Sequence, residues 1–153
     1  MRVAARPSPL RAWLLCGTLD IAYAALWSIA AGGTVGGMLR GVAKGPFGDG
    51  AAGWGPGGAV AGLATHYAIM GAMVAAFVGF APRWSARTGW PWWLTGTLYG
   101  LLLYLIMNAA VLPLRFGAPF PPADPVKGLV ALFPHIAFVG LPLAWLYLRG
   151  DKQ

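Results

Sequence analysis

Four apolar stretches, each about twenty residues long, set what this chain can fold into. A bilayer core of about 30 Å needs roughly 20 mostly apolar residues in a helix. A backbone in lipid must also satisfy its own hydrogen bonds, and a helix does so within one segment. We therefore predict an all-α protein, a single membrane domain over residues 1–153 that forms an integral membrane bundle of four transmembrane helices. The predicted spans are residues 12–31, 58–81, 92–114 and 128–148.

Composition favours lipid over water as the main solvent. Of the 153 residues, 58% are hydrophobic and 10% are charged, and the four acidic residues include no Glu. Soluble domains carry about 25% charged residues. The formal net charge of +7 raises nucleic-acid binding as an alternative. Because the basic residues lie in short segments between the apolar stretches and form no single patch, we predict the lipid bilayer as partner and no nucleic acid.

The distribution of lysine and arginine predicts the orientation of the bundle, because cytoplasmic loops carry an excess of these residues. One side carries seven of them: Arg2, Arg6, Arg11, Arg83, Arg87, Arg149 and Lys152. The other side carries four: Arg40, Lys44, Arg115 and Lys127. We therefore expect both termini in the cytoplasm. Six of the eight tryptophans fall at the cytoplasmic ends of the spans, as an interfacial belt does: Trp13, Trp84, Trp90, Trp92, Trp93 and Trp145.

The segment between the first and second spans is too polar to cross lipid. Residues 35–44 predict a short interfacial helix, with Met38, Leu39 and Val42 towards lipid. Residues 45–58 are rich in glycine and are expected to form a turn without a binding role.

Small residues four positions apart recur in the later spans, and such pairs let two helices approach closely in lipid. The pairs are Gly58 with Gly62, Gly71 with Ala75, Gly96 with Gly100, and Gly140 with Ala144. They predict a compact bundle or, alternatively, a homodimer through these helix faces.

Each predicted span carries one strongly polar side chain. An ionisable group within a span is costly, about 2.5 to 3.5 kcal/mol for a central Asp, and so marks the first place to look for function. With a rise of about 1.5 Å per residue, the four polar residues fall in one layer from the midplane to the outer half. The predicted cluster is Asp20, His66, Asn108 and His135.

Four interpretations of this cluster stay open. It is a purely structural set of polar contacts that fixes helix register, or it couples a proton on Asp20 to movement of a small solute. The second interpretation resembles the logic of small multidrug transporters, which place one acidic residue in the first of four short helices, although theirs is a Glu. Alternatively His66 and His135 ligate haem b, as two histidines on different helices can. Asp20 with both histidines as a metal site has the weakest support.

Motifs of enzymes are missing. Without Glu there is no H-E-x-x-H helix, no phosphate-binding loop is present, and the three serines do not form a nucleophile elbow. The sequence therefore gives no support for an enzyme.

One motif in each span contributes to a family resemblance. The motifs are Gly17-Thr18-Leu19-Asp20-Ile21, His66-Tyr67-Ala68-Ile69, Met107-Asn108 followed by Leu112-Pro113-Leu114, and His135 before Gly140-Leu141-Pro142. Together they resemble a group of short four-helix bacterial membrane proteins and, more distantly, YagU-type inner-membrane proteins. The resemblance implies four spans and a place in the bacterial inner (plasma) membrane, and it brings no established activity. We expect a small proton-linked transporter or a transport-associated component.

Overall fold

The computed structural model describes residues 8–149, and within them the chain is helical with no strand. Four helical stretches are long and apolar enough to cross a membrane: Pro9–Ala30, Gly55–Thr88, Trp92–Phe116 and Pro125–Leu148. The prediction of an all-α chain with four long apolar helices is confirmed. The two termini lie outside the described residues, as do Arg2, Arg6 and Lys152, which contributed to the predicted orientation.

The first two long helices are continuous and the last two are interrupted. The first is α1 (Pro9–Ala30) and the second is α3 (Gly55–Thr88). The third consists of α4 (Trp92–Leu105), the π-helical segment η2 (Ile106–Val111) and α5 (Leu112–Phe116). The fourth consists of α6 (Pro125–Pro134), the π-helical segment η3 (His135–Gly140) and α7 (Leu141–Leu148).

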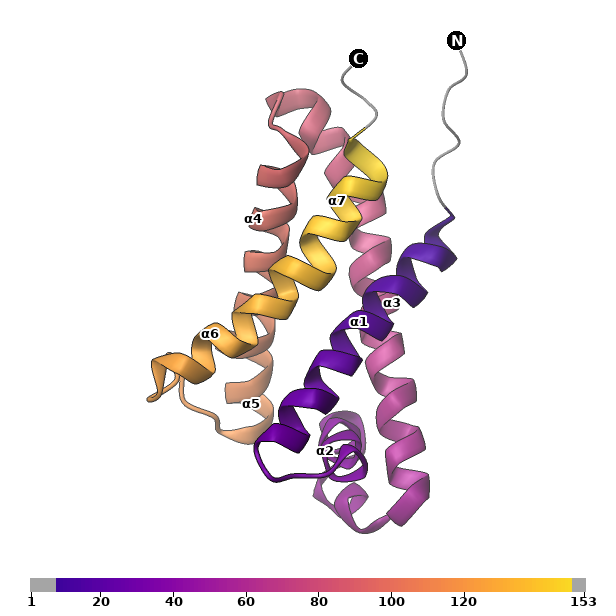
Figure 1. The fold of residues 1–153 in the computed structure, drawn as a ribbon, viewed down its shortest axis with the longest axis vertical. Coiled ribbons are helices and arrows are strands. Elements are labelled where there is room, and N and C mark those ends of the chain that lie inside the picture. The colour runs from indigo at the N-terminus through magenta and orange to yellow at the C-terminus, as the bar shows by residue number, and fades with distance from the viewer. Residues whose placement is uncertain (1–7, 150–153) are drawn as a thin grey trace.

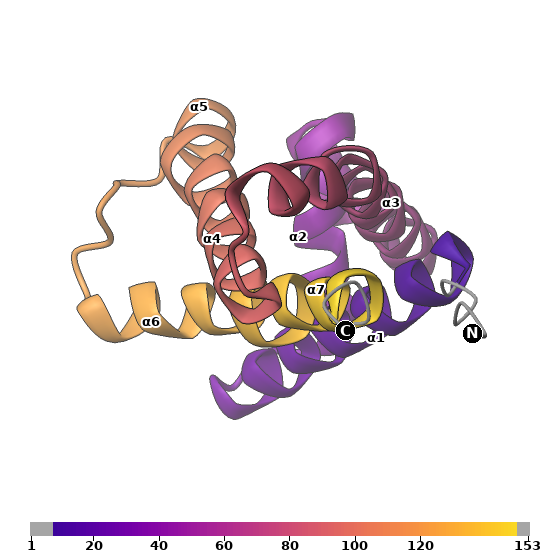
Figure 2. The ribbon, with the colours of Figure 1, turned by 90° about the horizontal axis from the view of Figure 1, so that it is seen from above.

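The fourth long helix occupies the middle of the bundle. Figures 1 and 2 show it between α4 on one side and α1 on the other, and η3 and α7 contact both of these helices. The start of α1, the end of α7 and the connection from α3 to α4 lie towards one end of the molecule (Figure 1). We call this the α3–α4 end. The opposite end carries α2 (Val35–Phe47) and α5, and we call it the α2 end.

Glycines make the crossing of the third and fourth long helices close. A Cβ atom on Gly96 would lie 2.7 Å from the Gly140 carbonyl oxygen and 2.8 Å from the Ala144 methyl group. A Cβ atom on Gly100 would lie 2.5 Å from the carbonyl oxygen of His135. Two of the predicted small-residue pairs therefore face each other inside one chain. The homodimer through small-residue helix faces stays a prediction.

Helix α2 differs from its predicted role. Its Ala43 side chain is buried, Val42 lines a cavity inside the bundle, and the backbone carbonyl of Leu39 lies against Gly62 of α3. Met38 lines a second, more open pocket beside α1. The physical reason is the glycine pair on α3, because Gly62 leaves no side chain between the two helices. The apolar side of α2 thus covers the bundle.

The connection after α2 is also more ordered than expected. It forms a short 3₁₀ turn, η1 (Asp49–Gly53), and Arg115 ties it to the end of α5. The Arg115 guanidinium donates to the carbonyls of Lys44 (2.7 Å) and Gly45 (3.0 Å), and it lies 3.6 Å from the Asp49 carboxylate. Asp49 also pairs with the Lys44 ammonium at 3.3 Å. These contacts fasten the glycine-rich segment to the third long helix.

Candidate functional site

The structure brings the four sequence-predicted polar residues together around one cavity. Asp20 comes from α1, His66 from α3, Asn108 from η2 and His135 from η3. All four line a space of about 230 Å³, which we call the central cavity. Its remaining walls are apolar side chains and include three methionines: Val42, Ile69, Met70, Met73, Met107, Leu112, Ala131 and Val139. Each long helix therefore contributes one polar group to the same space.

His66 and Asp20 form the closest contact among these groups. The His66 Nε2 atom lies 2.9 Å from the carbonyl oxygen of Gly17, and the Nδ1 atom lies 3.8 Å from the Asp20 carboxylate. A carbonyl oxygen only accepts hydrogen bonds, so Nε2 must carry a proton. The Asp20 and His66 side chains are 22% and 11% exposed, so water screens their interaction weakly.

Because Nε2 carries a proton, the Nδ1 atom of His66 is the ring atom whose protonation depends on the charge of Asp20. If Asp20 is ionised, His66 needs a second proton on Nδ1 to form an ion pair. If His66 is neutral, Nδ1 is an acceptor and favours a protonated Asp20. The third state, an ionised Asp20 beside the Nδ1 lone pair, sets two acceptors against each other. One proton beyond that on Nε2 makes the pair neutral overall, and the Asp20 carboxylate and the His66 Nδ1 atom are the two sites that can hold it.

Local packing positions Asp20 and His66 for this contact. A Cβ atom on Gly17 would lie 2.7 Å from the ring of Tyr67, so the glycine lets α1 approach α3. The hydroxyl groups of Tyr67 and Thr18 share a hydrogen bond of 2.8 Å across the same interface. The Trp13 indole donates to the Tyr67 carbonyl at 2.7 Å. These contacts hold the Gly17 carbonyl where His66 can donate to it.

His135 and Asn108 lie on the two π-helical segments. The His135 Nδ1 atom donates to the Ala131 carbonyl at 2.7 Å, which leaves Nε2 as an acceptor in the neutral ring. The Asn108 amide donates to the Tyr104 carbonyl at 3.1 Å. These side chains bond within their own helices and contribute their remaining polar atoms to the central cavity.

A proline follows the end of each π-helical segment. Leu112 donates its N–H five residues back to Met107, and Leu141 does the same to Ile136. The next residues are Pro113 and Pro142, which have no N–H to donate. Wide turns of this kind recur at functional sites because they loosen the regular hydrogen-bond ladder. Here both lie at the level of the polar residues.

Two further pockets share lining residues with the central cavity on the side of the α2 end. Asp20 and His135 also line a pocket of about 540 Å³ between α1 and α6, together with Tyr23, Ser28 and Lys127. Asn108 lines another, of about 370 Å³, which also reaches Lys127 and the loop before α6. The polar groups of the central cavity are thus shared with spaces that open towards this end.

Towards the α3–α4 end the bundle is closed by apolar packing. Phe77, Val139, Leu143 and Cys16 are the largest fully buried side chains among the described residues, and they join one core cluster. Met70, which lines the central cavity, belongs to the same cluster. The four polar residues therefore lie on the α2-end side of an apolar core.

The geometry bears on the metal interpretation and on the haem interpretation in different ways. Within residues 8–149 no group of three His, Cys, Asp or Glu side chains is placed to hold a metal ion. His66 and His135 do line one cavity, but the His66 Nε2 atom is bonded to Gly17. Haem ligation through that atom would break this hydrogen bond. Haem binding remains a prediction.

Three parts of the site were missed from the sequence. Val42 closes the cavity from α2, the Gly17 carbonyl fixes the tautomer of His66, and Lys127 lines both open pockets. Gly17 carried a signal, since a glycine one turn before a buried Asp lets a neighbouring helix approach. Pro113, five residues after Asn108, was a second signal, because it marks the wide turn in the third long helix.

Comparisons of the chain with protein-family models, with curated proteins and with solved structures return no match. The resemblance to short bacterial inner-membrane proteins therefore stays a prediction. The class of protein is therefore described from its fold and its site alone. It is an all-helical protein with four helices long and apolar enough to cross a membrane, and with a polar cavity between them.

Proposed function

We propose that the protein is a small proton-linked transporter of the bacterial inner membrane. Its four long apolar helices would cross the bilayer, with α2 covering the bundle at the outer surface. The seven-to-four count of lysine and arginine in the sequence, which includes Arg2, Arg6 and Lys152 outside the described residues, supports a cytoplasmic position for the α3–α4 end. In this orientation the pockets beside the central cavity open outward, and the apolar core closes the inner side.

The single observation that carries this proposal is the contact between Asp20 and His66 on the wall of the central cavity. With one proton the pair is neutral overall, whichever of the two residues holds it. Loss of the proton leaves a net negative charge, which is costly in a weakly polar surrounding. A solute that brings one positive charge restores neutrality. One-for-one exchange of a proton for a cation therefore keeps the charge of the cavity constant.

The cavity suggests the size and character of the solute. Ligand pockets for drug-sized molecules occupy roughly 300 to 1,000 Å³, and the central cavity is about 230 Å³. Methionine side chains adapt their shape and are polarisable, so they suit alkyl groups beside a charge. Met70, Met73 and Met107 line the same cavity as Asp20. A compact alkylammonium ion fits these requirements.

The direct test is proton release on addition of tetramethylammonium, a permanent cation that cannot act as a base. Purified protein in lightly buffered detergent is titrated while a pH indicator follows released protons. Wild type should release about one proton per bound cation in the pH range where the pair is protonated, and Asp20→Asn should release none. Asp49→Asn is the matched control, because Asp49 lies outside the central cavity and its removal should leave the release unchanged. Equal release by wild type and Asp20→Asn would remove Asp20 from the mechanism.

Two other interpretations give different results in the same preparation. If the cluster is purely structural, Asp20→Asn and His66→Gln change thermal stability and no ligand response exists to lose. If His66 and His135 hold haem b, protein from haem-replete cells shows a Soret band that shifts on reduction.

A further inference from the structure

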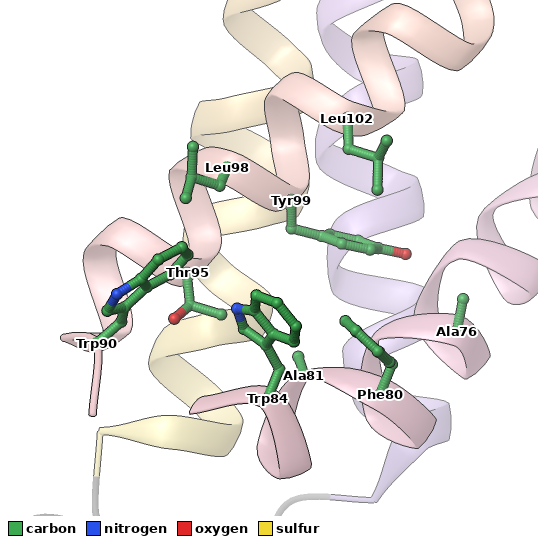
Figure 3. Close-up of a pocket in the computed structure, with 9 residues that line it drawn as sticks. All are labelled: Ala76, Phe80, Ala81, Trp84, Trp90, Thr95, Leu98, Tyr99 and Leu102. Atoms are coloured by element: carbon green, nitrogen blue, oxygen red, sulfur yellow. The ribbon is translucent and has the colours of Figure 1, made fainter. Parts of the chain in front are cut away.

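Another hollow lies between α3 and α4 near the α3–α4 end, away from the polar residues. It is a groove of about 390 Å³, and Figure 3 shows side chains from both helices around it. Four aromatic residues contribute: Phe80 and Trp84 from α3, Tyr99 from α4, and Trp90 from the connection. Small and aliphatic residues complete the lining: Ala76, Ala81, Thr95, Leu98 and Leu102. We call this the α3–α4 groove.

The groove offers a hydrocarbon surface, because its polar side chains have partners elsewhere. The Tyr99 hydroxyl donates to the Met73 carbonyl at 2.6 Å, and the Thr95 hydroxyl donates to Pro91 at 3.4 Å. Phe80 and Trp84 stack with their rings 5.6 Å apart and are 62% and 40% exposed. An exposed apolar hollow of this kind binds an apolar chain.

Charge at the end of α3 indicates what is attached to that chain. Ala76, Phe80, Arg83, Trp84 and Arg87 follow one another at spacings that keep them on one face of the helix. The two arginines therefore continue the face that lines the groove. Arg87 lies three residues beyond Trp84, about 4.5 Å further along the helix axis. The basic groups stand at the mouth of an apolar groove.

No carboxylate balances these arginines within residues 8–149. The acidic residues there are Asp20, Asp49 and Asp124, and the ion pairs are those of Lys44 and Arg115 with Asp49 and of His66 with Asp20. Arg83 donates to the Gly79 carbonyl of its own helix, which has no charge. Within the part of the chain that the structure describes, these arginines have no carboxylate partner, so an anion would complement their charge.

We propose that the α3–α4 groove binds an anionic phospholipid, with one acyl chain between α3 and α4 and the phosphate against Arg83 and Arg87. Aromatic side chains such as Trp84 and Trp90 favour the boundary between hydrocarbon and headgroups, where the two parts of a lipid meet. The cytoplasmic leaflet, which this end would face, is the one rich in anionic lipid. This inference rests on the membrane location in the proposed function and not on its proton chemistry.

Native mass spectrometry of the delipidated full chain tests the proposal, with phosphatidylglycerol and phosphatidylcholine of identical acyl chains as probes. Wild type should retain one phosphatidylglycerol in clear preference to phosphatidylcholine. The double variant Arg83→Gln with Arg87→Gln should lose about 30-fold in phosphatidylglycerol affinity, since each arginine near an anionic lipid contributes about fivefold. Arg11→Gln removes a charge from the same end outside the groove and should change little.

A filling variant tests the acyl-chain half of the site. Ala76→Phe places a ring in the groove and should weaken both lipids, whereas Ala75→Phe, on an exposed neighbouring position that does not line the groove, should weaken neither. Equal retention of the two lipids by wild type would overturn the proposal, as would Ala76→Phe binding phosphatidylglycerol like wild type. A lipid-free dimer that Ala76→Phe dissociates would show that a second copy of the chain covers the groove instead. Proton release by tetramethylammonium stays at the wild-type level in these variants, so the two proposals fail separately.

Discussion

Replacing Gly100 by alanine should separate the third and fourth long helices at the level of the polar residues. The new Cβ atom would lie 2.5 Å from the His135 carbonyl oxygen and 2.7 Å from the Ile136 Cα atom. Non-bonded contacts of a Cβ atom do not fall below 3.0 Å, so the two backbones must move apart by at least about 0.5 Å. Overpacking of this kind costs about 1 to 3 kcal/mol, and the better helix propensity of alanine returns about 1 kcal/mol. The net loss is about 0 to 2 kcal/mol, and relative to a glycine-to-alanine change without the clash it is about 1 to 3 kcal/mol.

Thermal unfolding in detergent, followed by circular dichroism, measures this loss. At this chain length it corresponds to a melting temperature up to about 8 °C below wild type, and roughly 2 to 12 °C below a glycine-to-alanine control without the clash. Gly79→Ala is the matched control, because Gly79 lies within α3 and an added Cβ atom there meets nothing within 4 Å. The control should melt at the wild-type temperature or slightly above it. If Gly100→Ala melts with Gly79→Ala, the third and fourth helices do not cross where we describe.

Three further predictions concern charge. Lys127→Gln removes a positive charge from a side chain that lines both open pockets. Tetramethylammonium should then bind about two- to fivefold more tightly at low salt, and the gain should shrink at high salt. An unchanged titration would mean that the cation does not enter past Lys127. Arg115→Met should lower the free energy of unfolding by about 1 to 2 kcal/mol, a figure kept small because the side chain is 33% exposed. High salt should not remove this loss, because two neutral carbonyls accept the hydrogen bonds of Arg115. Reporter fusions at Asp49, Arg87 and Asp124 should report outside, inside and outside, and an outside signal at Arg87 would reverse the orientation.

The helices and the polar residues could be predicted because each rests on a property of one segment. Apolar length alone marks the four long helices. A strongly polar side chain in such a segment stands out against its neighbours, and one occurs in each long helix. Because antiparallel helices bring equal depths together, the shared depth of Asp20, His66, Asn108 and His135 already suggested that they meet.

The contacts between segments could not be predicted in the same way. The amphipathic pattern of α2 is equally consistent with a face towards lipid and a face towards the bundle, and Gly62 on another helix decides between them. The tautomer of His66 depends on a backbone carbonyl, which has no signature in the side-chain sequence. The small-residue pair of Gly96 and Gly100 predicted close packing, and only the fold identifies Gly140 as its partner.

The measurement that tests the central claim most directly is an infrared difference spectrum of the protein with and without tetramethylammonium. The account predicts that binding removes one proton signal, either the protonated-carboxyl band of Asp20 or the imidazolium band of His66, because those two sites share the proton. The same difference should be absent from Asp20→Asn, and Asp49→Asn should retain it. If the cation binds wild type and neither band changes, the Asp20 and His66 pair does not exchange its proton for a solute, and the proposed function is wrong.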